Sequence, residues 1–504
     1  MTEVFDSPLP LLALLTSVGA ATLVLLSHRT PKLRDGWSTL AAAVQVALVA
    51  FMLPDVLNGR VPETQLFELS PGIELVLRAD AMGMVFALLA SSLWLVVSVY
   101  SVGYMRSLQE ASQTRFFTVF ALSMTATIGV AFSANLLTFV LFYELLTLFT
   151  YPLVVHHETE EAVRAGRKYL FYTLSSGLAL IGATAWVQIL GIDATFRPGG
   201  FLSGLESDLQ RWGLFALLIG GVGVKAAIMP LHGWLPSAMV APAPVSALLH
   251  AVAVVKAGAF GVIRMVGFVF GVGLLQEMGA WQVLATAAGS TLIIGSVLAL
   301  RHDNLKRRLA YSTISHLSYI ALGVALLGPT AWIGAILHLV GHGVTKITLF
   351  MCAGAIHART HRENVSEMTG IGRQMPITMG AFALAALSMA GIPPFVLFTS
   401  KWYLGLGAAE VGHQVFLILY MVSGVLTASY LFPVVFRAFW RSSPAFPRYA
   451  EASTAMVLPL AVTAGLALWL GTSPDFPFRF FELAEQISQS VTSPDSTTLA
   501  GGGP

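Results

Sequence analysis

Apolar runs long enough to cross a membrane recur along almost the whole chain. A helix needs about 20 mostly apolar residues to span the hydrocarbon core of a bilayer, and such runs extend from residue 8 to residue 471. Only 11% of the residues are charged, against about 25% in an average soluble domain. The sequence therefore predicts an all-α polytopic membrane protein.

The apolar runs predict about 14 transmembrane helices. We place them near 8–27, 36–56, 80–102, 114–132, 134–155, 166–190, 211–235, 243–269, 280–300, 308–327, 329–356, 378–408, 412–437 and 453–471. Between the second and third helices, residues 57–79 contain short alternating runs around a Pro-Gly, which predicts a hairpin. After residue 472 we expect an amphipathic surface helix in PDFPFRFFELAEQI and disorder in residues 493–504.

Basic segments mark one side of the predicted bundle. They occupy residues 28–34, 163–168, 301–308, 357–365 and 437–448. With 14 spans all five fall on the same side, and cytoplasmic loops carry an excess of lysine and arginine. We therefore expect a multi-pass protein of the bacterial cytoplasmic (inner) membrane, with both termini outside.

The composition excludes several classes of function. A net charge of +2 gives no reason to expect a nucleic-acid partner, and the single cysteine excludes an internal disulfide, a cysteine-ligated zinc site and an iron–sulfur cluster. No phosphate-binding or dinucleotide fingerprint is present. We expect no cofactor. The first apolar run, 9–26, lacks the basic start and cleavage site of a signal peptide, so we interpret it as a retained helix.

Ionisable side chains interrupt the apolar runs at mid-helix positions. A charge at the bilayer centre costs about 2.5–3.5 kcal/mol on insertion scales, and such residues commonly line ion or proton paths. One of them alone is equally well explained by snorkelling or by a hydrogen bond between helices. Eight of them favour a path: Glu144, Lys225, His250, Lys256, His338, His342, Lys346 and Lys401.

Three of these groups share one face of one predicted helix. His338, His342 and Lys346 are spaced i, i+4, i+8 and cover about 12 Å of depth. A metal site is the alternative interpretation of the two histidines, but nothing nearby completes a ligand set, so we expect no metal. The HHE at 156–158 lies at a helix end beside a charged loop, where we expect solvated surface.

Prolines break two of the predicted helices close to a lysine. Pro230 follows Lys225 by five residues, and Pro393 and Pro394 precede Lys401. Proline removes a backbone donor and frees carbonyls of the preceding turn, which a membrane tolerates only where protein or water satisfies them. Each break therefore predicts a buried, hydrated position, with a packing kink as the alternative.

Lysine, glutamate and histidine in such a row suit proton transfer. A buried lysine or glutamate can change its charge when an opposite charge approaches or withdraws, and histidine titrates near neutral pH. The row predicts proton conduction without covalent chemistry, hence no catalytic residue.

The residues above and the segment KAAIMPLHGWLPSAMVAPAPVSALLHAVAVVKAG (225–258) resemble the antiporter-like subunits. This family comprises subunits of Mrp-type cation/proton antiporters, the L, M and N type subunits of respiratory complex I, and subunits of membrane-bound hydrogenases. The resemblance covers the whole chain, most strongly 80–440. The segments 150–170 and 398–412 look most like the D-type subunits of Mrp antiporters.

The resemblance implies two inverted five-helix repeats, each with a proline-broken helix. The implied divisions are 1–113, 114–269, 280–437, 438–472 and 473–504. Glu144 matches the family's helix-5 glutamate, Lys225 its helix-7 partner and Lys256 the central helix-8 lysine. His338 and His342 match the connecting histidines of helix 11, and Lys401 matches the charged residue of helix 12.

The family implies a proton-translocating subunit of a multisubunit Na⁺(K⁺)/H⁺ antiporter. Its partners would be other membrane subunits, protons, a monovalent cation and the lipid bilayer. A proton would enter near Lys225 and Lys256, pass His338 and His342 and leave by Lys401, while Glu144 controls Lys225. The alternatives are an N-type complex I subunit, part of an NADH:quinone oxidoreductase, a subunit of an ion-pumping hydrogenase, a non-conducting scaffold subunit, and a carrier for an organic solute.

Overall fold

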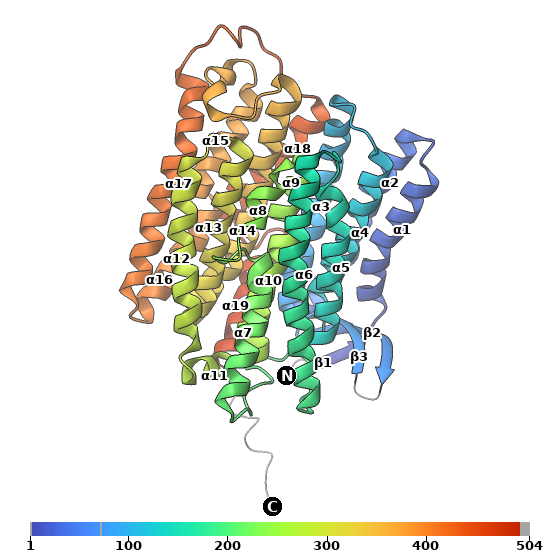
Figure 1. Ribbon diagram of the computed structural model, residues 1–504, viewed down its shortest axis with the longest axis vertical. Coiled ribbons are helices and arrows are strands. Elements are labelled where there is room, and N and C mark those ends of the chain that lie inside the picture. Colours follow the sequence, from blue (N-terminus) through green and yellow to red (C-terminus); the bar gives the residue numbers. More distant parts are fainter. Residues whose placement is uncertain (1–2, 71–72, 494–504) are drawn as a thin grey trace, which may run out of the picture.

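The computed structural model describes residues 3–70 and 73–493 and consists almost entirely of long helices that run roughly parallel to one axis (Figure 1). The first third of the chain contains β1 (Glu3–Asp6), α1 (Leu9–Leu26), α2 (Pro31–Leu57), β2 (Arg60–Ser70), β3 (Ile73–Arg78) and α3 (Ala81–Ser107). The strands form a small sheet in the order β1-β2-β3. The predicted hairpin is confirmed, since β2 and β3 pair antiparallel. The sequence missed β1, which joins β2 in parallel.

Two sets of helices build the centre of the molecule. The first contains α4 (Gln113–Ala131), α5 (Leu136–Val154), α6 (Glu160–Ile189), α7 (Asp208–Lys225), α8 (Trp234–Ser237), η1 (Ala238–Val240), α9 (Ala243–Ala251), α10 (Val254–Arg264) and the π-helix η2 (Met265–Phe270). The second contains α12 (Ala280–Arg301), α13 (Leu305–Ala325), α14 (Pro329–Thr360), η3 (Val365–Glu367), η4 (Ile371–Arg373), α15 (Pro376–Ala390), α16 (Val396–Glu410) and α17 (Gln414–Trp440). The short α11 (Val272–Glu277) joins them.

Eleven helices of the described residues are long and apolar enough to cross a membrane. Three further predicted spans are too charged or too short to be counted among these eleven helices. α7 and the first turn of α13 carry several charges, and a break splits α15 from α16. Together they account for the predicted number of spans.

Side-chain caps start several spans where the sequence changes from polar to apolar. Asp80 accepts a hydrogen bond from the Gly83 amide at 2.7 Å, and Asn135 accepts one from the Thr138 amide at 2.8 Å. Such caps satisfy amides that have no partner inside the helix.

The last two helices close the bundle on one side. α18 (Thr454–Thr472) packs on α14, α3 and α15, and α19 (Phe480–Thr492) lies against α14 and α3. The predicted amphipathic helix is therefore present, with its apolar face buried under other helices rather than on an open surface. Of the segment predicted to be disordered, residues 494–504 lie outside the described residues.

The loops lie at alternate ends of the bundle, as expected for spans that cross a membrane in alternating directions. The N-terminus, the sheet and α19 lie in the lower part of Figure 1, and the turn between α1 and α2 lies at the opposite end. We call that opposite end, which carries the five basic segments, the basic face. Its position in the cytoplasm stays a prediction.

Candidate functional site

The first pair of predicted site residues lies where α7 ends. Lys225 is the last residue of α7 and is fully buried, and its Nζ lies 3.8 Å from Oε1 of Glu144 on α5. The Nζ also donates to the Tyr143 carbonyl and lies 3.5 Å from the centroid of the Tyr143 ring. The Glu144 side chain is 19% exposed. The structure thus brings the predicted lysine and glutamate together.

Gly177 on α6 makes room for that carboxylate. A Cβ built at this glycine would lie 2.3 Å from Cδ of Glu144. Glu144 therefore occupies a slot between α5 and α6 that a larger residue at position 177 would close.

The break at Pro230 is confirmed, and a side chain from beyond it contacts the end of α7. Helical structure stops after Lys225 and resumes at Trp234, although the sequence predicted one span over 211–235. The indole of Trp234 donates back to the Val224 carbonyl at 2.8 Å. The Ala227 amide donates to the same carbonyl at 3.0 Å, so backbone and side chain together hold the end of α7.

A further interruption, which the sequence did not predict, lies beside Lys256. The span expected at 243–269 stops at Ala251, resumes at Val254 and ends in the π-helix η2. Because residues 252–253 contain no proline or glycine, no local signal marks this interruption. It falls between two predicted site residues, His250 and Lys256.

Lys256 connects to the histidines of α14. Its Nζ lies 2.9 Å from Nδ1 of His342 and donates to the Leu339 carbonyl at 2.9 Å. Both side chains are completely buried. No hydrogen bond joins Lys225 to Lys256 within the described residues, but α10 touches the end of α7 because Gly258 has no side chain: a Cβ there would lie 2.1 Å from the Ala226 amide.

His316 of α13 is a buried site residue that the sequence prediction missed. Its ring is nearly parallel to those of His338 and His342, with centroids 5.3 and 5.4 Å away, and its Nδ1 lies 3.2 Å from Nε2 of His338. It thus lies beside both predicted histidines, whose own centroids are 6.2 Å apart, so that the three centroids form a triangle. The three nearly parallel imidazoles form one cluster, which we call the histidine stack.

The row of titratable side chains continues from the histidines to the second broken helix, α15–α16. Nδ1 of His338 lies 2.9 Å from the Ser400 hydroxyl, and the next residue, Lys401, lies 5.2 Å from the ring of Tyr319. Lys401 is partly exposed and donates to the Met389 carbonyl at 2.7 Å. Pro393 and Pro394 lie between α15 and α16, so this break is confirmed too.

Lys346 and His250 lie on the basic-face side of the histidine stack. Lys346 Nζ donates to the Ser312 hydroxyl at 2.8 Å and to the Leu309 carbonyl at 2.9 Å. The ring of His250 stacks on Phe350 with centroids 4.5 Å apart. Neither ring nitrogen of His250 has a hydrogen-bond partner among the described residues.

One expectation about the loops is wrong. The sequence suggested that the HHE at 156–158 is solvated surface, but His156 is only 5% exposed. Its ring meets the edge of Phe116 on α4, with centroids 5.7 Å apart. Burial lowers the pKa of His156 and so favours the neutral ring. His157 and Glu158 are exposed as expected.

A second buried charge that the sequence prediction missed lies near the opposite end of the bundle. Both terminal nitrogens of Arg264, which is completely buried, contact the Asp80 carboxylate at 2.6 Å. Asp80 also caps α3. This bidentate pair lies away from the histidine stack and ties α10 to the start of α3.

The described residues include no group of three His, Cys, Asp or Glu side chains placed to hold a metal ion. What the structure offers is a set of lysines, histidines and one glutamate, mostly fully buried, that passes between two broken helices. Such a set can bind, hold and pass protons. The chain is thus a multi-pass membrane protein with a titratable interior.

Comparison with known proteins gives the family. The family model described as "NADH:quinone oxidoreductase/Mrp antiporter, TM" matches residues 133–427, and the model for the N-terminus of complex I chain 5 matches residues 69–117. The chain belongs to the NADH:quinone oxidoreductase/Mrp antiporter family, as a membrane component of the antiporter type.

Relatives of both branches are similar to this chain. The N subunit of the NADH-quinone oxidoreductase of Desulforudis audaxviator is 34% identical over 74% of this chain and 74% of its own length. The A/B subunit of a probable K⁺/H⁺ antiporter of Rhizobium meliloti is 33% identical over 71% of this chain and 36% of its own length. The A1 subunit of a Na⁺/H⁺ antiporter of Staphylococcus haemolyticus is 30% identical over 85% of this chain and 55% of its own length. The chain thus spans about half or less of these antiporter relatives.

Solved structures agree on the fold. A chain of the Mrp complex from Dietzia sp. DQ12-45-1b superposes with a TM-score of 0.85 over 98% of both chains, at 21% identity. A chain of the archaeal membrane-bound sulfane sulfur reductase superposes with a TM-score of 0.83, also at 21% identity. At this identity the likeness shows the fold alone.

Proposed function

We propose that the chain is the proton-translocating D-type subunit of an Mrp-type monovalent cation/proton antiporter. Its partners are the other membrane subunits of that complex. It lies in a bacterial cytoplasmic membrane with both termini outside and is not itself an enzyme. The observation that carries the proposal is the row formed by two hydrogen-bonded sets, Lys256 with His342 and His316 through His338 to Ser400, whose rings at His342 and His316 lie 5.4 Å apart.

Protons enter near Lys225 and Lys256, pass the histidine stack and leave by Lys401. Neutral imidazole has one donor and one acceptor nitrogen, so neighbouring rings can hand a proton on. Glu144 controls the first step because its distance from Lys225 decides whether the ammonium is stabilised. The 3.8 Å separation supports this role, since it is close enough for attraction and longer than a tight hydrogen bond.

The first test removes the charges of this pair. We expect Lys225→Ala and Glu144→Gln each to lower cation-driven proton exchange about 100-fold or more, while the protein still inserts and assembles. Exchange is measured in inverted vesicles with a ΔpH-sensitive dye. Lys32→Ala and Glu158→Gln, at exposed positions outside the row, are the matched controls. Normal exchange in both row variants would refute the proposal.

The second candidate is an antiporter-like component of a redox pump, and the 34% identity to an N-type relative favours it. The same row would then move protons driven by chemistry on other chains. Adding Na⁺, K⁺ and Li⁺ in turn without NADH separates the two candidates. Cation-dependent loss of ΔpH supports the antiporter, and proton pumping that requires NADH supports the redox pump.

A further inference from the structure

A groove of about 680 Å³ lies where α3 packs against α2 on one side and against the start of α18 on the other. Its floor is apolar and consists of Leu40 and Ala43 of α2 and Val99 and Val102 of α3. No residue of the titratable row lines it in the described part of the chain. Its volume lies within the range of about 300–1,000 Å³ that is typical of ligand pockets.

The floor of the groove belongs to the surface that faces the hydrocarbon of the bilayer. Leu40 is 54% exposed, and Ala43, one turn further along α2, is exposed as well. Both lie within a helix that is long and apolar enough to span the membrane. Because the bilayer core contains no water, an apolar hollow at this depth is suited to a hydrocarbon chain.

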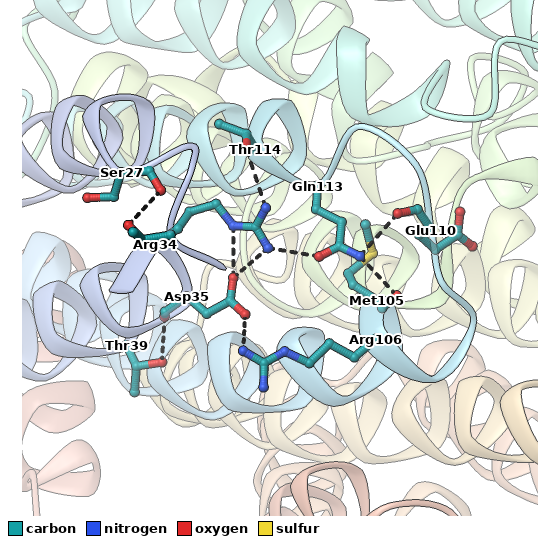
Figure 2. A network of polar contacts seen from close by, with 10 residues as sticks. Ser27, Arg34, Asp35, Thr39, Met105, Arg106, Glu110, Gln113 and Thr114 are labelled. Carbon is teal, nitrogen blue, oxygen red and sulfur yellow. Dashed lines mark hydrogen bonds and ion pairs between the residues drawn. The ribbon is translucent and has the colours of Figure 1, made fainter. Parts of the chain in front are cut away.

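The end of the groove nearest the basic face carries an excess of positive charge (Figure 2). Asp35 accepts hydrogen bonds from Arg34 at 2.8 and 2.9 Å and from Arg106 at 2.6 Å. Arg34 also donates to the side chains of Gln113 at 2.8 Å and Thr114 at 3.3 Å. One buried carboxylate therefore serves two guanidinium groups, of which Arg34 is fully occupied.

Arg106 is the guanidinium that keeps free donors. Only its Nη2 bonds to Asp35, and its Nε and Nη1 have no partner among the described residues. The Arg106 side chain is 48% exposed and lines the groove from the last turn of α3. A guanidinium with free N–H groups can bind a phosphate through paired hydrogen bonds. The charge and the geometry of this end therefore fit an anionic phosphate group.

The start of α18 adds a second attraction for an anion at the same end. Ala455, the second residue of α18, lines the groove, and the Ser453 side chain does not cap the helix. The first amides of a helix have no partner inside it and carry partial positive charge. Gly103 of α3 allows this approach, since a Cβ there would lie 3.0 Å from Cβ of Ala455. Gly103 precedes Arg106 by three residues, so the guanidinium and the helix start are neighbours.

We propose that this groove binds an anionic phospholipid from the leaflet at the basic face. The phosphate bonds to the free nitrogens of Arg106 beside the start of α18, and an acyl chain lies on the apolar floor. The basic segment 28–34, which leads into α2, borders this end and attracts anionic headgroups. An apolar helix of another subunit would cover the floor but leave the Arg106 donors unpaired, so the charge favours the lipid.

The test measures lipid binding to the assembled complex and does not depend on transport. The purified complex in detergent receives a trace of phosphatidylglycerol with a diazirine in its acyl chain, and crosslinked peptides are mapped by mass spectrometry after irradiation. Unlabelled phosphatidylglycerol, phosphatidylcholine and inorganic phosphate are the competitors. Ala43→Trp fills the floor, and Arg106→Gln removes the charge. Ala47→Trp is the matched control, because Ala47 is exposed on the same helix but does not line the groove.

We expect crosslinks in α2 and α3 beside the groove that unlabelled phosphatidylglycerol suppresses and phosphatidylcholine suppresses only weakly. Ala43→Trp should lower their yield about tenfold or more, and Arg106→Gln about fivefold, whereas Ala47→Trp should leave it unchanged. Equal competition by phosphatidylcholine, or an unchanged yield in Ala43→Trp, would overturn the proposal. Competition by inorganic phosphate would instead indicate a site for free anions and would also contradict it.

A second measurement identifies what covers the groove in the intact membrane. Leu40→benzoylphenylalanine places a photoreactive group on the floor, and cells that contain the complex are irradiated before extraction. We expect an adduct with a phospholipid, detected by the mass of the α2 peptide. A crosslink to another protein subunit would show that a protein helix occupies the groove and would overturn the lipid site.

Discussion

His316 lies close to two other imidazoles, which constrains the charge of the whole cluster. Two adjacent protonated rings repel each other strongly in an apolar interior. The stack of His316, His338 and His342 therefore favours a single excess proton, which moves by exchange of donor and acceptor roles. Position 316 is the only one of the three that contacts both others within these distances, so we expect it to set the rate through the stack.

His316→Gln should therefore lower proton exchange about 100-fold, because an amide can hydrogen-bond here but cannot take up a proton. His28→Gln, at an exposed position on the basic face, is the matched control. The measurement is the initial rate of ΔpH loss in vesicles with equal amounts of assembled complex. An unchanged rate in His316→Gln would show that protons bypass the stack.

A site residue could be predicted from the sequence when its neighbours along the chain are apolar, and was missed when they are polar. Glu144 and Lys225 stand out because each interrupts an apolar run. His316 lies in AYSTISHLSY, where serines, threonine and tyrosines make a histidine look ordinary. Only the packing of α13 against α14 reveals that it lies beside His338 and His342. Arg264 was missed because it lies at the end of a helix, where snorkelling explains an arginine equally well.

At the scale of elements, each broken helix brings non-helical backbone close to a lysine side chain in the interior of the bundle. Proline signals the breaks at Pro230 and Pro393, so the sequence could predict them. The interruption between α9 and α10 has no such signal, because it depends on the helices around it rather than on its own residues. Each of these three irregular segments has a lysine of the row within about two turns.

The second element that the sequence described incompletely is α19. Its amphipathic pattern was visible, but its partners were not, because they lie more than a hundred residues earlier in α14 and α3. Leu483 and Ile487 are buried there. The helix therefore packs across α14 and α3 at the end of the bundle opposite the basic face.

Leu483→Ala should lower the stability of the folded chain by about 2–5 kcal/mol, since it empties a buried site. The expected result is a lower melting temperature of the purified complex in detergent. Gln489→Ala, on the exposed face of the same helix, should leave the melting temperature unchanged. Equal melting temperatures for wild type and Leu483→Ala would mean that α19 contributes nothing to stability.

At the scale of the molecule, the two five-helix sets each have a proline break in their fourth span, and the histidine stack lies between these breaks. Because each set has an odd number of spans, α4 and α12 start from opposite faces (Figure 1). This agrees with the inverted repeat that the family resemblance implied, which stays a prediction. The row of titratable groups therefore runs across the bundle, from Glu144 in the first set to Lys401 in the second.

The most direct test of the central claim is proton flux through a chain with Lys256→Ala, because Lys256 connects the first set to the histidine stack. The complex is expressed with wild-type chain, Lys256→Ala or the exposed control Lys32→Ala, and ΔpH loss in inverted vesicles is followed as Na⁺, K⁺ or Li⁺ is added. We predict that cation-dependent exchange persists in the control and disappears in Lys256→Ala at equal assembly. Full exchange in Lys256→Ala would contradict the account, because protons would then cross without the buried row.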